Sequence, residues 1–480
     1  MSFDTAGYWY GEGEGHRCGY CQNETTNIST GLYLSFISPH RYNALIDRGW
    51  RRSGMYMYKP SMEKTCCPQY TVKCNALLFR ISRSQKKVLR HFIEYLENSK
   101  PGSLPSRGRG QMSTDVTDVA NDHHEHPSVT HNVEISPDVK ATVPVDNGKP
   151  ISNHVTHKTS ATSSAAETTE PKCFKTGAQL ADSKKKRDFR RLRKLKKIAA
   201  EKNLSWEEMD VRSLGSQPDP PSLSDRLSRA IANKRLEIKL IPVDRDNAES
   251  EFNRTFSESH KVFQKYQMAI HNDTPDECKE QSYKRFLCQP PFNWEEEDEQ
   301  GGYHHQYYLD GKLVAVGVLD LLPRCLSSVY FFYDPDYGAL SFGTLSALFE
   351  IQLTQQMNTR HPDIAWYYMG YYIHTCPKMK YKSKFYPSYL TCPKKHTWWP
   401  IEECEKLLDE NKLCVFDEKT EEEPVPTEEE LGTLKVLLGR SLCLYSVYKM
   451  MQEEDDYKDI LVDFVKLAGL ENARNICIYH

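Results

Sequence analysis

The sequence predicts a protein of the α/β (α+β) class, with a small cysteine-rich unit, a polar linker and a larger domain built on a mixed sheet. The larger domain is indicated by buried-type strands that alternate with amphipathic helices in the carboxyl half. Paired cysteines near the amino terminus indicate the small unit, and a stretch poor in large apolar residues separates the two.

The composition fits a protein with ordinary hydrophobic cores. Its 480 residues, 39% of them hydrophobic, predict two or more domains. We expect no membrane association, because the sequence has neither a long apolar run nor a signal-peptide core. The odd number of cysteines, 15, favours reduced thiols and metal ligands over disulfides, and therefore a cytoplasmic or nuclear location. The net charge of −3 is nearly neutral, but it is segregated into basic and acidic blocks.

The densest structural signal lies between residues 311 and 385. Residues 311–320 and 326–333 are short, apolar and rich in β-branched or aromatic side chains, which predicts two buried strands. Residues 341–357 predict a helix with Ser341 as its N-cap, and residues 365–373 return to strand. We therefore expect a βαβ crossover whose flanking strands lie parallel in one sheet.

The turn before this helix is acidic. Loops that join a strand's carboxyl end to a helix are natural ligand sites, and Asp334 and Asp336 suit a cationic group better than a phosphate. A plain surface turn, with Asp and Pro as turn formers, is the alternative.

A basic and aromatic segment follows the last of these strands. If the chain is extended there, four alternate lysines share one side: Lys378, Lys380, Lys382 and Lys384. Such a row can follow a phosphate backbone while aromatic side chains stack on bases. The alternative is a solvated edge strand protected by lysines.

Residues 1–98 are predicted to form the small metal-binding unit. Its ligands are two cysteine pairs with two spare residues nearby: Cys18 and Cys21, Cys66 and Cys67, and the spares Cys74 and His16. A set of soft thiolates selects zinc or an iron–sulfur centre. Four buried cysteines without a metal are the alternative.

The same unit contains a cluster of arginines. A short helix from residue 42 is expected to end at Gly49, and Arg48, Arg51 and Arg52 lie at its end. They can bind a carboxylate bidentately or contact phosphates, although surface arginines without a ligand are equally common. A strand over 75–80 and a helix over 85–98 complete the unit.

The middle of the chain is predicted to lack a core. Residues 99–176 are rich in Ser, Thr, Pro and His, which predicts a disordered linker. Residues 177–235 are expected to form a basic helical segment, in which the run 184–197 predicts a nucleic-acid contact or a nuclear import signal.

The second globular domain is expected over 236–480. A strand at 235–242 precedes a helix at 250–271, where His260 and Gln267 are polar exceptions. A strand at 302–309 then leads into a hairpin turn at residues 310–311. One or two helices close the chain after the acidic stretch 402–430.

Several separated motifs closely resemble the eukaryotic arginyl-tRNA protein transferases. They are His16 to Cys21, Cys66 to Pro68, Phe263 to Gln267, and the blocks 317–350 and 367–385. The resemblance covers both globular parts and implies an acetyltransferase-like (GNAT-type) fold in the carboxyl half, distantly similar to bacterial leucyl/phenylalanyl-tRNA protein transferases. It also implies transfer of arginine from arginyl-tRNA to proteins that begin with Asp, Glu or oxidised Cys, which marks them for ubiquitin-dependent degradation. In that family four cysteines bind an iron–sulfur cluster or zinc, and they match Cys18, Cys21, Cys66 and Cys67.

This reaction does not require a strong catalyst. A free α-amine is available at neutral pH and the aminoacyl ester is activated, so positioning and oxyanion stabilisation suffice. We expect Asp334 and Asp336 to bind the donor guanidinium, and His260 and Gln267 to make further substrate contacts. The residues expected to orient the amine or to protonate the ribose oxygen are Tyr368, Tyr371, Tyr372 and His374. The four lysines are expected to bind the tRNA, and the acidic acceptor residue is expected to bind to Arg48, Arg51 and Arg52.

The expected partners are arginyl-tRNA and proteins with acidic amino-terminal residues, without coenzyme A or a nucleotide cofactor. An acetyl-CoA-dependent acetyltransferase is disfavoured, because the acidic turn would repel a pyrophosphate. A non-catalytic, metal-dependent RNA-binding scaffold has no need for a carboxylate pair beside aromatic hydroxyls. The sequence makes no prediction about oligomeric state.

Overall fold

The computed structural model describes residues 5–105, 222–292, 299–438, 441–452 and 457–479. The described residues on both sides of the gap at 106–221 belong to one structural unit. The basic run 184–197 and most of the predicted linker lie outside the described residues.

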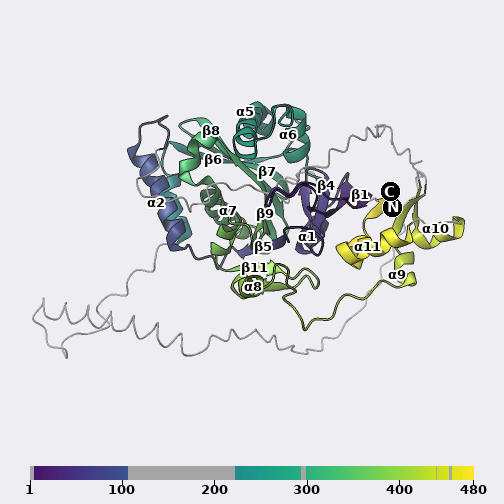
Figure 1. The fold of residues 1–480 in the computed structure, drawn as a ribbon. Coiled ribbons are helices and arrows are strands. Elements are labelled where there is room, and N and C mark those ends of the chain that lie inside the picture. Colours follow the sequence, from purple (N-terminus) through teal and green to yellow (C-terminus); the bar gives the residue numbers. More distant parts are fainter. Residues whose placement is uncertain (1–4, 106–221, 293–298, 439–440, 453–456, 480) are drawn as a thin grey trace, which may run out of the picture. The chain divides into compact units, whose positions relative to one another are not determined.

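The larger of two sheets has eight strands and contains the predicted crossover (Figure 1). Its order is β12 (Trp398–Pro400), β11 (Ser388–Thr391), β5 (Tyr70–Asn75), β10 (Trp366–Tyr372), β9 (Cys325–Tyr333), β8 (Lys312–Leu322), β7 (Gly301–Leu309) and β6 (Leu236–Pro242). The predicted strands at 235–242, 302–309, 311–320, 326–333 and 365–373 are confirmed to within two residues at each end.

Helix α7 (Phe342–Asn358) connects β9 to β10, and these two strands pair in parallel, as predicted. Ser341 precedes the helix but makes no side-chain cap, because its backbone is left-handed with φ 59°. The two strands pair only from Trp366 to Tyr368, and a register shift follows in β10, where Gly370 has φ 68°. Since β9 continues to Tyr333 against β8, the parallel strands diverge toward their carboxyl ends.

Helices cover both faces of this sheet. Phe332 of β9 packs on Phe263 of α5 (Glu251–Tyr266), with ring centroids 5.6 Å apart. The next residue, Phe331, packs on Tyr307, which contacts Phe349 of α7. Because successive strand residues point to opposite faces, α5 and α7 lie on opposite sides. The fold is therefore mixed α/β, as predicted.

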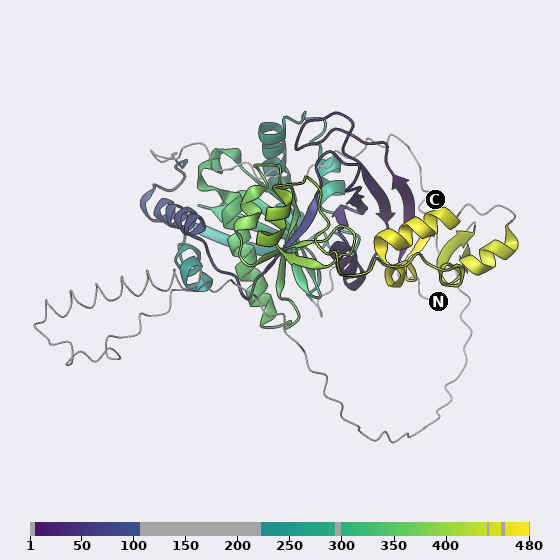
Figure 2. The same ribbon diagram turned by 60° about the horizontal axis from the view of Figure 1, so that its bottom comes forward.

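The second sheet has seven strands and contains both the first and the last described strand (Figure 2). Its order is β14 (Ser441–Leu444), β13 (Lys435–Leu438), β15 (Cys477–Tyr479), β1 (Ala6–Glu12), β2 (Ser29–Leu34), β4 (Tyr56–Pro60) and β3 (Arg51–Ser53). The sheets do not divide at residue 98, the predicted boundary: β5 belongs to the larger sheet, and the carboxyl-terminal β15 pairs in parallel with β1.

The remaining elements are mostly short. They are α1 (Pro39–Asp47), α2 (Arg83–Asn98), α4 (Leu223–Ile231), η1 (Gln267–His271), α6 (Glu280–Leu287), η2 (Pro335–Leu340), η3 (Lys380–Lys384), α8 (Ile401–Leu408), α9 (Glu428–Gly432), α10 (Tyr445–Met451), α11 (Lys458–Ala468) and α12 (Leu470–Ala473). The predicted helices at 42–49, 85–98, 250–271 and 341–357 are confirmed in outline. None of the described helices is long and apolar enough to span a membrane.

The predicted strand at 75–80 is wrong. The strand ends at Asn75, whose side-chain oxygen accepts the backbone N–H groups of Leu77 and Leu78, each at 3.1 Å. This local bonding turns the chain, and both leucines are exposed.

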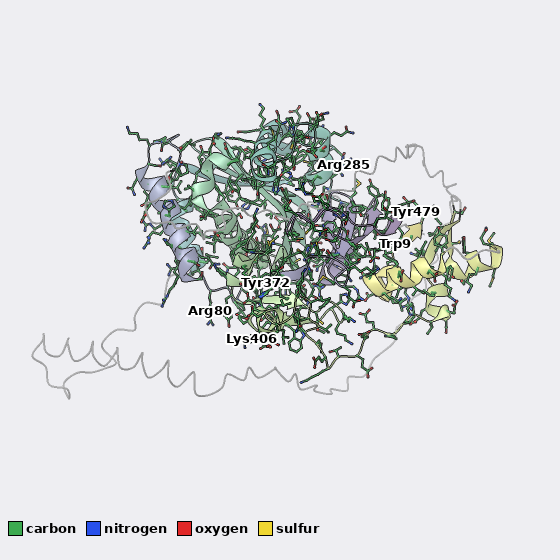
Figure 3. All side chains as sticks on the ribbon, viewed as in Figure 1. Trp9, Arg80, Arg285, Tyr372, Lys406 and Tyr479 are labelled. Atoms are coloured by element: carbon green, nitrogen blue, oxygen red, sulfur yellow. The ribbon has the colours of Figure 1, made fainter. Side chains whose placement is uncertain are left out.

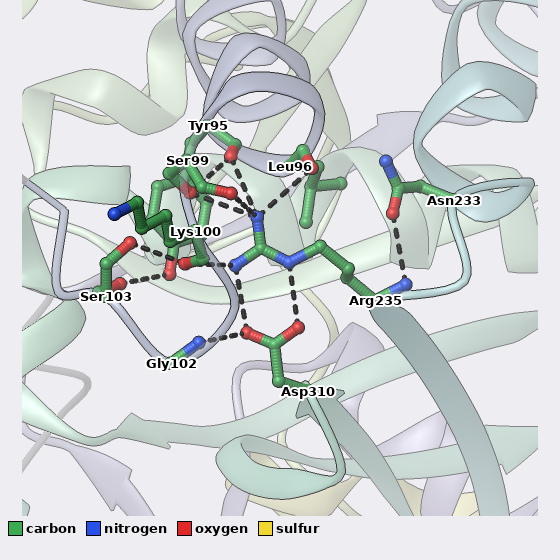
Figure 4. A network of polar contacts seen from close by, with 9 residues as sticks. All are labelled: Tyr95, Leu96, Ser99, Lys100, Gly102, Ser103, Asn233, Arg235 and Asp310. Carbon is green, nitrogen blue, oxygen red and sulfur yellow. Dashed lines mark hydrogen bonds and ion pairs between the residues drawn. The ribbon is translucent and has the colours of Figure 1, made fainter.

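Arg235 connects elements that lie before and after residues 106–221 in the sequence (Figure 4). Its guanidinium donates to both carboxylate oxygens of Asp310, at 2.7 and 2.8 Å, and to the carbonyls of Tyr95, Leu96 and Ser99 at the end of α2. Carbonyl groups at a helix end lack intrahelical partners, so Arg235 caps α2 and holds it against the β7–β8 turn.

Candidate active site and metal centre

The four predicted cysteine ligands meet in one cluster. The Sγ atoms of Cys18, Cys21, Cys66 and Cys67 lie within 4.8 Å of one another. Two backbone hydrogen bonds shape the cluster: Gln22 N to Cys18 O at 2.8 Å, and Cys66 N to Thr26 O at 2.8 Å. The predicted juxtaposition of the two pairs is confirmed.

The sulfur atoms fit a metal. A tetrahedral zinc ion with thiolate bonds of about 2.3 Å separates its sulfur ligands by about 3.8 Å, within the spacing found here. The two spare ligands lie outside this set: the His16 ring contacts Asn27, and Cys74 is buried in β5. Burial raises the pKa of Cys18 to about 12, whereas hydrogen bonds to Asn23 and the other thiols outweigh burial at Cys21 and lower its pKa to about 7. A bound cation would deprotonate all four thiols.

The cluster packs against the end of β10. Cys18 and Cys67 share a small apolar core with Ile373, Cys376 and Met379. These residues lie on both sides of His374 and at the start of the lysine-rich segment. The cysteine cluster and this segment are thus in direct contact.

The predicted carboxylates, Asp334 and Asp336, lie at the carboxyl end of β9. Asp334 is buried and accepts from Lys265 Nζ at 2.5 Å and Lys312 Nζ at 2.8 Å, while Asp336 accepts from Lys265 at 2.6 Å. Burial opposes ionisation of Asp334, but these ammonium groups outweigh it and lower its pKa. The two carboxylates therefore bind cationic groups, and in this structure those groups are the side chains of Lys265 and Lys312.

Two of the predicted tyrosines face the α1–β3 turn. The Tyr368 hydroxyl donates to Oδ1 of Asp47, and the Tyr371 hydroxyl donates to Gly49 O at 2.7 Å. The Arg51 guanidinium carbon lies 5.1 Å from the centre of the Tyr371 ring. Burial, followed by the nearby Asp47 charge, raises the pKa of Tyr368 well above its usual value, so its hydroxyl stays protonated.

Tyr372 and His374 form a separate chain of contacts toward α8. The Tyr372 hydroxyl donates to Glu405 Oε1 at 2.9 Å and also lies 2.9 Å from His374 Nδ1. His374 Nε2 lies 2.8 Å from Asp409 Oδ1. Since Asp409 only accepts, Nε2 carries a proton in this geometry.

The three predicted arginines differ in their availability. Arg52 is buried, and its Nε and Nη2 donate to Asp320 at 2.7 and 2.6 Å. Arg51 is also buried and donates to the carbonyls of Ile46 and Trp50. Neither guanidinium group is accessible to a protein substrate, which corrects the expectation for Arg51 and Arg52. Of the three predicted arginines, Arg48 remains a candidate for binding the acidic residue.

The lysine segment is not extended, so the predicted alternation is wrong. Residues 380–384 form the 3₁₀ helix η3, in which Lys382 is buried and donates to Tyr371 O at 2.6 Å. Lys378, Lys380 and Lys384 are exposed. The exposed Arg80, labelled in Figure 3, adjoins them through its bridge to Tyr386. The three exposed lysines and Arg80 therefore form a basic surface that does not include Lys382.

His260 and Gln267 lie on the side of the sheet covered by α5. His260 Nε2 lies 2.8 Å from Cys278 O. Gln267 is buried, accepts from the Tyr330 hydroxyl at 2.8 Å and donates to Asp273 at 2.9 Å. Both residues therefore have partners within the fold.

A cavity of about 650 Å³ opens beside Asp47 and Arg48. Charged and aromatic residues that the sequence did not single out also line it: Arg324, Lys395, His396, Trp398, Glu423 and Glu430. Next to Trp398, the Lys73 ammonium lies 3.7 Å from that ring centre and 4.3 Å from that of Trp366. Burial lowers the pKa of Lys73 to about 8. In the sequence, the signal that could have indicated this cavity is the group of charged residues just before two consecutive tryptophans, Trp398 and Trp399.

Comparisons with known proteins give the family. Two family models match the chain: "Arginine-tRNA-protein transferase, N terminus" over residues 16–87 and "Arginine-tRNA-protein transferase, C terminus" over 258–392. An arginyl-tRNA–protein transferase 1 of Drosophila melanogaster is 36% identical over 507 residues, which cover 99% of each chain. The chain belongs to the arginyl-tRNA–protein transferase family.

Further relatives support this membership and confirm the predicted family. The transferase is 32% identical to arginyl-tRNA–protein transferase 2 of Arabidopsis thaliana, over 83% of this chain and 76% of the relative. An aspartate/glutamate leucyltransferase of Vibrio campbellii is 44% identical over 84 residues, 18% of this chain and 34% of that one. The transferase is thus an aminoacyltransferase, and its substrates are an arginyl-tRNA and a protein.

Proposed function

We propose that the transferase moves arginine from arginyl-tRNA to the amino-terminal α-amine of proteins that begin with Asp, Glu or oxidised Cys. The added arginine would then direct the protein to ubiquitin-dependent degradation. The cavity that Asp47 and Arg48 line together carries the proposal. An acidic amino-terminal residue presents one ammonium and one carboxylate, and these two side chains complement both charges.

In the proposed reaction the α-amine nitrogen bonds to the carbonyl carbon of the arginyl ester. The bond from that carbon to the ribose oxygen breaks, and the proton lost by the amine ends on the ribose oxygen. Asp47 would hold the amine, and the Tyr368 hydroxyl would hold Asp47 in position through its hydrogen bond to Oδ1. Tyr371, Tyr372 and His374 then act by positioning β10, because their polar atoms contact groups of the protein itself.

The donor would lie where β9 and β10 diverge, since ligands of such sheets bind at the carboxyl ends of parallel strands. The predicted contact of the arginyl guanidinium with Asp334 and Asp336 does not fit this acceptor site, because Asp334 follows β9 whereas Arg324, the partner of Asp47, precedes it, about 30 Å away along the strand. His260 and Gln267 would support this region from α5 and η1. The exposed Lys378, Lys380 and Lys384 would contact the tRNA backbone.

For the metal, we propose one four-coordinate ion, with zinc as the first choice. The sulfur spacing suits a single ion, whereas an iron–sulfur cluster would require the four cysteines to move apart. The bound ion would supply structural cross-linking. Through Ile373, Cys376 and Met379 it would hold the lysine segment in place. A cytoplasmic and nuclear location stays a prediction from the cysteine content.

The test uses arginyl-tRNA with labelled arginine and peptides that differ only in their first residue. We expect label on peptides that begin with Asp or Glu, and none on those that begin with Ala. Equal transfer to all peptides would contradict the acceptor specificity. Tight tRNA binding without any transfer would instead support the RNA-binding scaffold.

A further inference from the structure

An acidic segment of this chain binds Arg48. The Arg48 guanidinium donates to both carboxylate oxygens of Glu423, from Nη1 to Oε1 at 2.8 Å and from Nη2 to Oε2 at 2.5 Å. The neighbouring Glu422 approaches Lys395, with Nζ 3.7 Å from Oε1. We call residues 418–427 the acidic strap.

The cationic partners of the strap are held firmly by the fold. The Arg48 side chain is only 15% exposed, and its guanidinium lies against Gly469, where an added Cβ would come within 3.0 Å of Cζ. Lys59 stands behind Arg48, with Nζ 3.1 Å from His396 Nε2 and 3.3 Å from Leu467 O. Burial and the Arg48 charge lower the pKa of Lys59 to about 7, so a carboxylate at Arg48 also relieves repulsion there.

The strap itself is held much less firmly. Residues 418–425 are exposed and form neither helix nor strand, and the Glu423 side chain is 55% exposed. Pro424 and Pro426 line the same cavity as Arg48. The strap therefore forms one wall of the cavity, and its Glu423 binds the largely buried Arg48. Such a segment can leave at little cost, since a half-exposed ion pair contributes little stability.

We propose that the acidic strap is an internal substitute for the acceptor. Glu423 would occupy the place of the acidic side chain of the acceptor's first residue, and it would leave when a protein with an amino-terminal Asp or Glu enters. Lys395 would be a second contact for the incoming carboxylate. This inference rests on the proposed acceptor specificity, and it adds competition within the chain.

The chemistry of the contact supports this assignment. A bidentate pair between a guanidinium and a carboxylate is the geometry in which arginine recognises an acidic side chain. Glu423 presents the same functional group as an acceptor glutamate, and the adjoining 650 Å³ leaves room for the peptide that follows it. Asp47, one residue before Arg48, would meet the acceptor's ammonium, for which the strap offers no counterpart.

The test compares Glu423→Gln with a matched control, Glu421→Gln, in the full-length protein. Both glutamates are exposed and two residues apart, but only Glu423 contacts Arg48. We expect Glu423→Gln to lower the KM for an Asp-initiated peptide about threefold to tenfold, the effect of removing a competing ion pair. The KM for arginyl-tRNA should stay unchanged, and Glu421→Gln should behave as wild type.

Binding provides a second, independent measurement. The affinity of a fluorescent Asp-initiated peptide, measured by anisotropy, should rise in Glu423→Gln, and the added Arg48→Gln substitution should abolish the gain. An unchanged affinity and KM in Glu423→Gln would overturn the inference. A wild-type protein that transfers no arginine to acidic peptides would overturn the proposed function instead. The peptide affinities of wild type and Glu423→Gln would then still decide whether the strap competes for this site.

Discussion

The hydroxyl of Tyr368 donates a hydrogen bond to Oδ1 of Asp47, which joins β10 to the carboxyl end of α1. The second oxygen of the same carboxylate accepts from Arg324 Nη2 at 2.6 Å. Asp47 is therefore fixed at both oxygens in the wall of the cavity. The three residues come from α1, the β8–β9 turn and β10, so this wall forms only when both sheets are assembled.

Replacement of Tyr368 by Phe should impair chemistry rather than tRNA binding. Loss of the hydroxyl frees Asp47, the group proposed to hold the amine, so we expect kcat to fall by about 10- to 100-fold with little change in the KM for arginyl-tRNA. Tyr457→Phe is the control, because its hydroxyl contacts Leu437 O in the other sheet. Wild-type kcat in Tyr368→Phe would remove this residue from the reaction.

Replacement of Arg52 by Ala should destabilise the fold. The ion pair with Asp320 is fully buried, and removal of one partner leaves an unpaired carboxylate, at a cost of about 3–5 kcal/mol in the free energy of unfolding. The exposed pair of Lys64 and Glu12 is the control, and Lys64→Ala should cost far less stability than Arg52→Ala. Denaturant unfolding measures both. Similar small losses in the two variants would contradict a structural role for Arg52.

The exposed and buried lysines should behave differently. Lys380→Ala and Lys384→Ala should each raise the Kd for arginyl-tRNA and reduce the slope of log K against log salt by about 0.7 to 1. Lys382→Ala should lower stability, because it leaves Tyr371 O without this donor, but it should keep the wild-type salt slope. A reduced slope in Lys382→Ala, with no change in the other two variants, would refute this division.

Metal binding should depend on the four clustered cysteines alone. Cys66→Ser should lose the bound metal, measured by elemental analysis of the purified protein, while Cys404→Ser should retain it, because Cys404 lies in α8 outside the cluster. Zinc should be present at about one ion per chain. Stoichiometric iron with sulfide would show instead that the cysteines separate around an iron–sulfur cluster.

The parts of the fold predicted from the sequence are those with local causes. The βαβ crossover follows from residues close together in the chain, whose apolar spacing differs between strand and helix. The sheet boundaries could not be predicted this way. Strand β5 pairs with β10 and β11, far downstream, and β15 pairs with β1 at the other end of the chain.

The same distinction applies to the site. The cysteine pairs were recognisable because thiolate spacing is itself a signal. Arg48, Arg51 and Arg52 look alike in sequence, yet only partners 268 and 375 positions away, Asp320 and Glu423, separate a buried structural arginine from one at a cavity. The prediction that four alternate lysines share one side was wrong for a local reason. It assumed an extended chain, whereas residues 380–384 form the 3₁₀ helix η3.

The most direct test of the account is the ratio of kcat/KM for Asp-initiated and Asn-initiated peptides, measured in wild type and in Arg48→Gln. These peptides differ only in the charge that Arg48 is proposed to bind. We predict a strong preference for Asp in wild type and, in Arg48→Gln, a loss confined to the Asp peptide that brings the ratio close to one. An undiminished preference for Asp in Arg48→Gln would contradict the account, because acidic acceptors would then be recognised elsewhere.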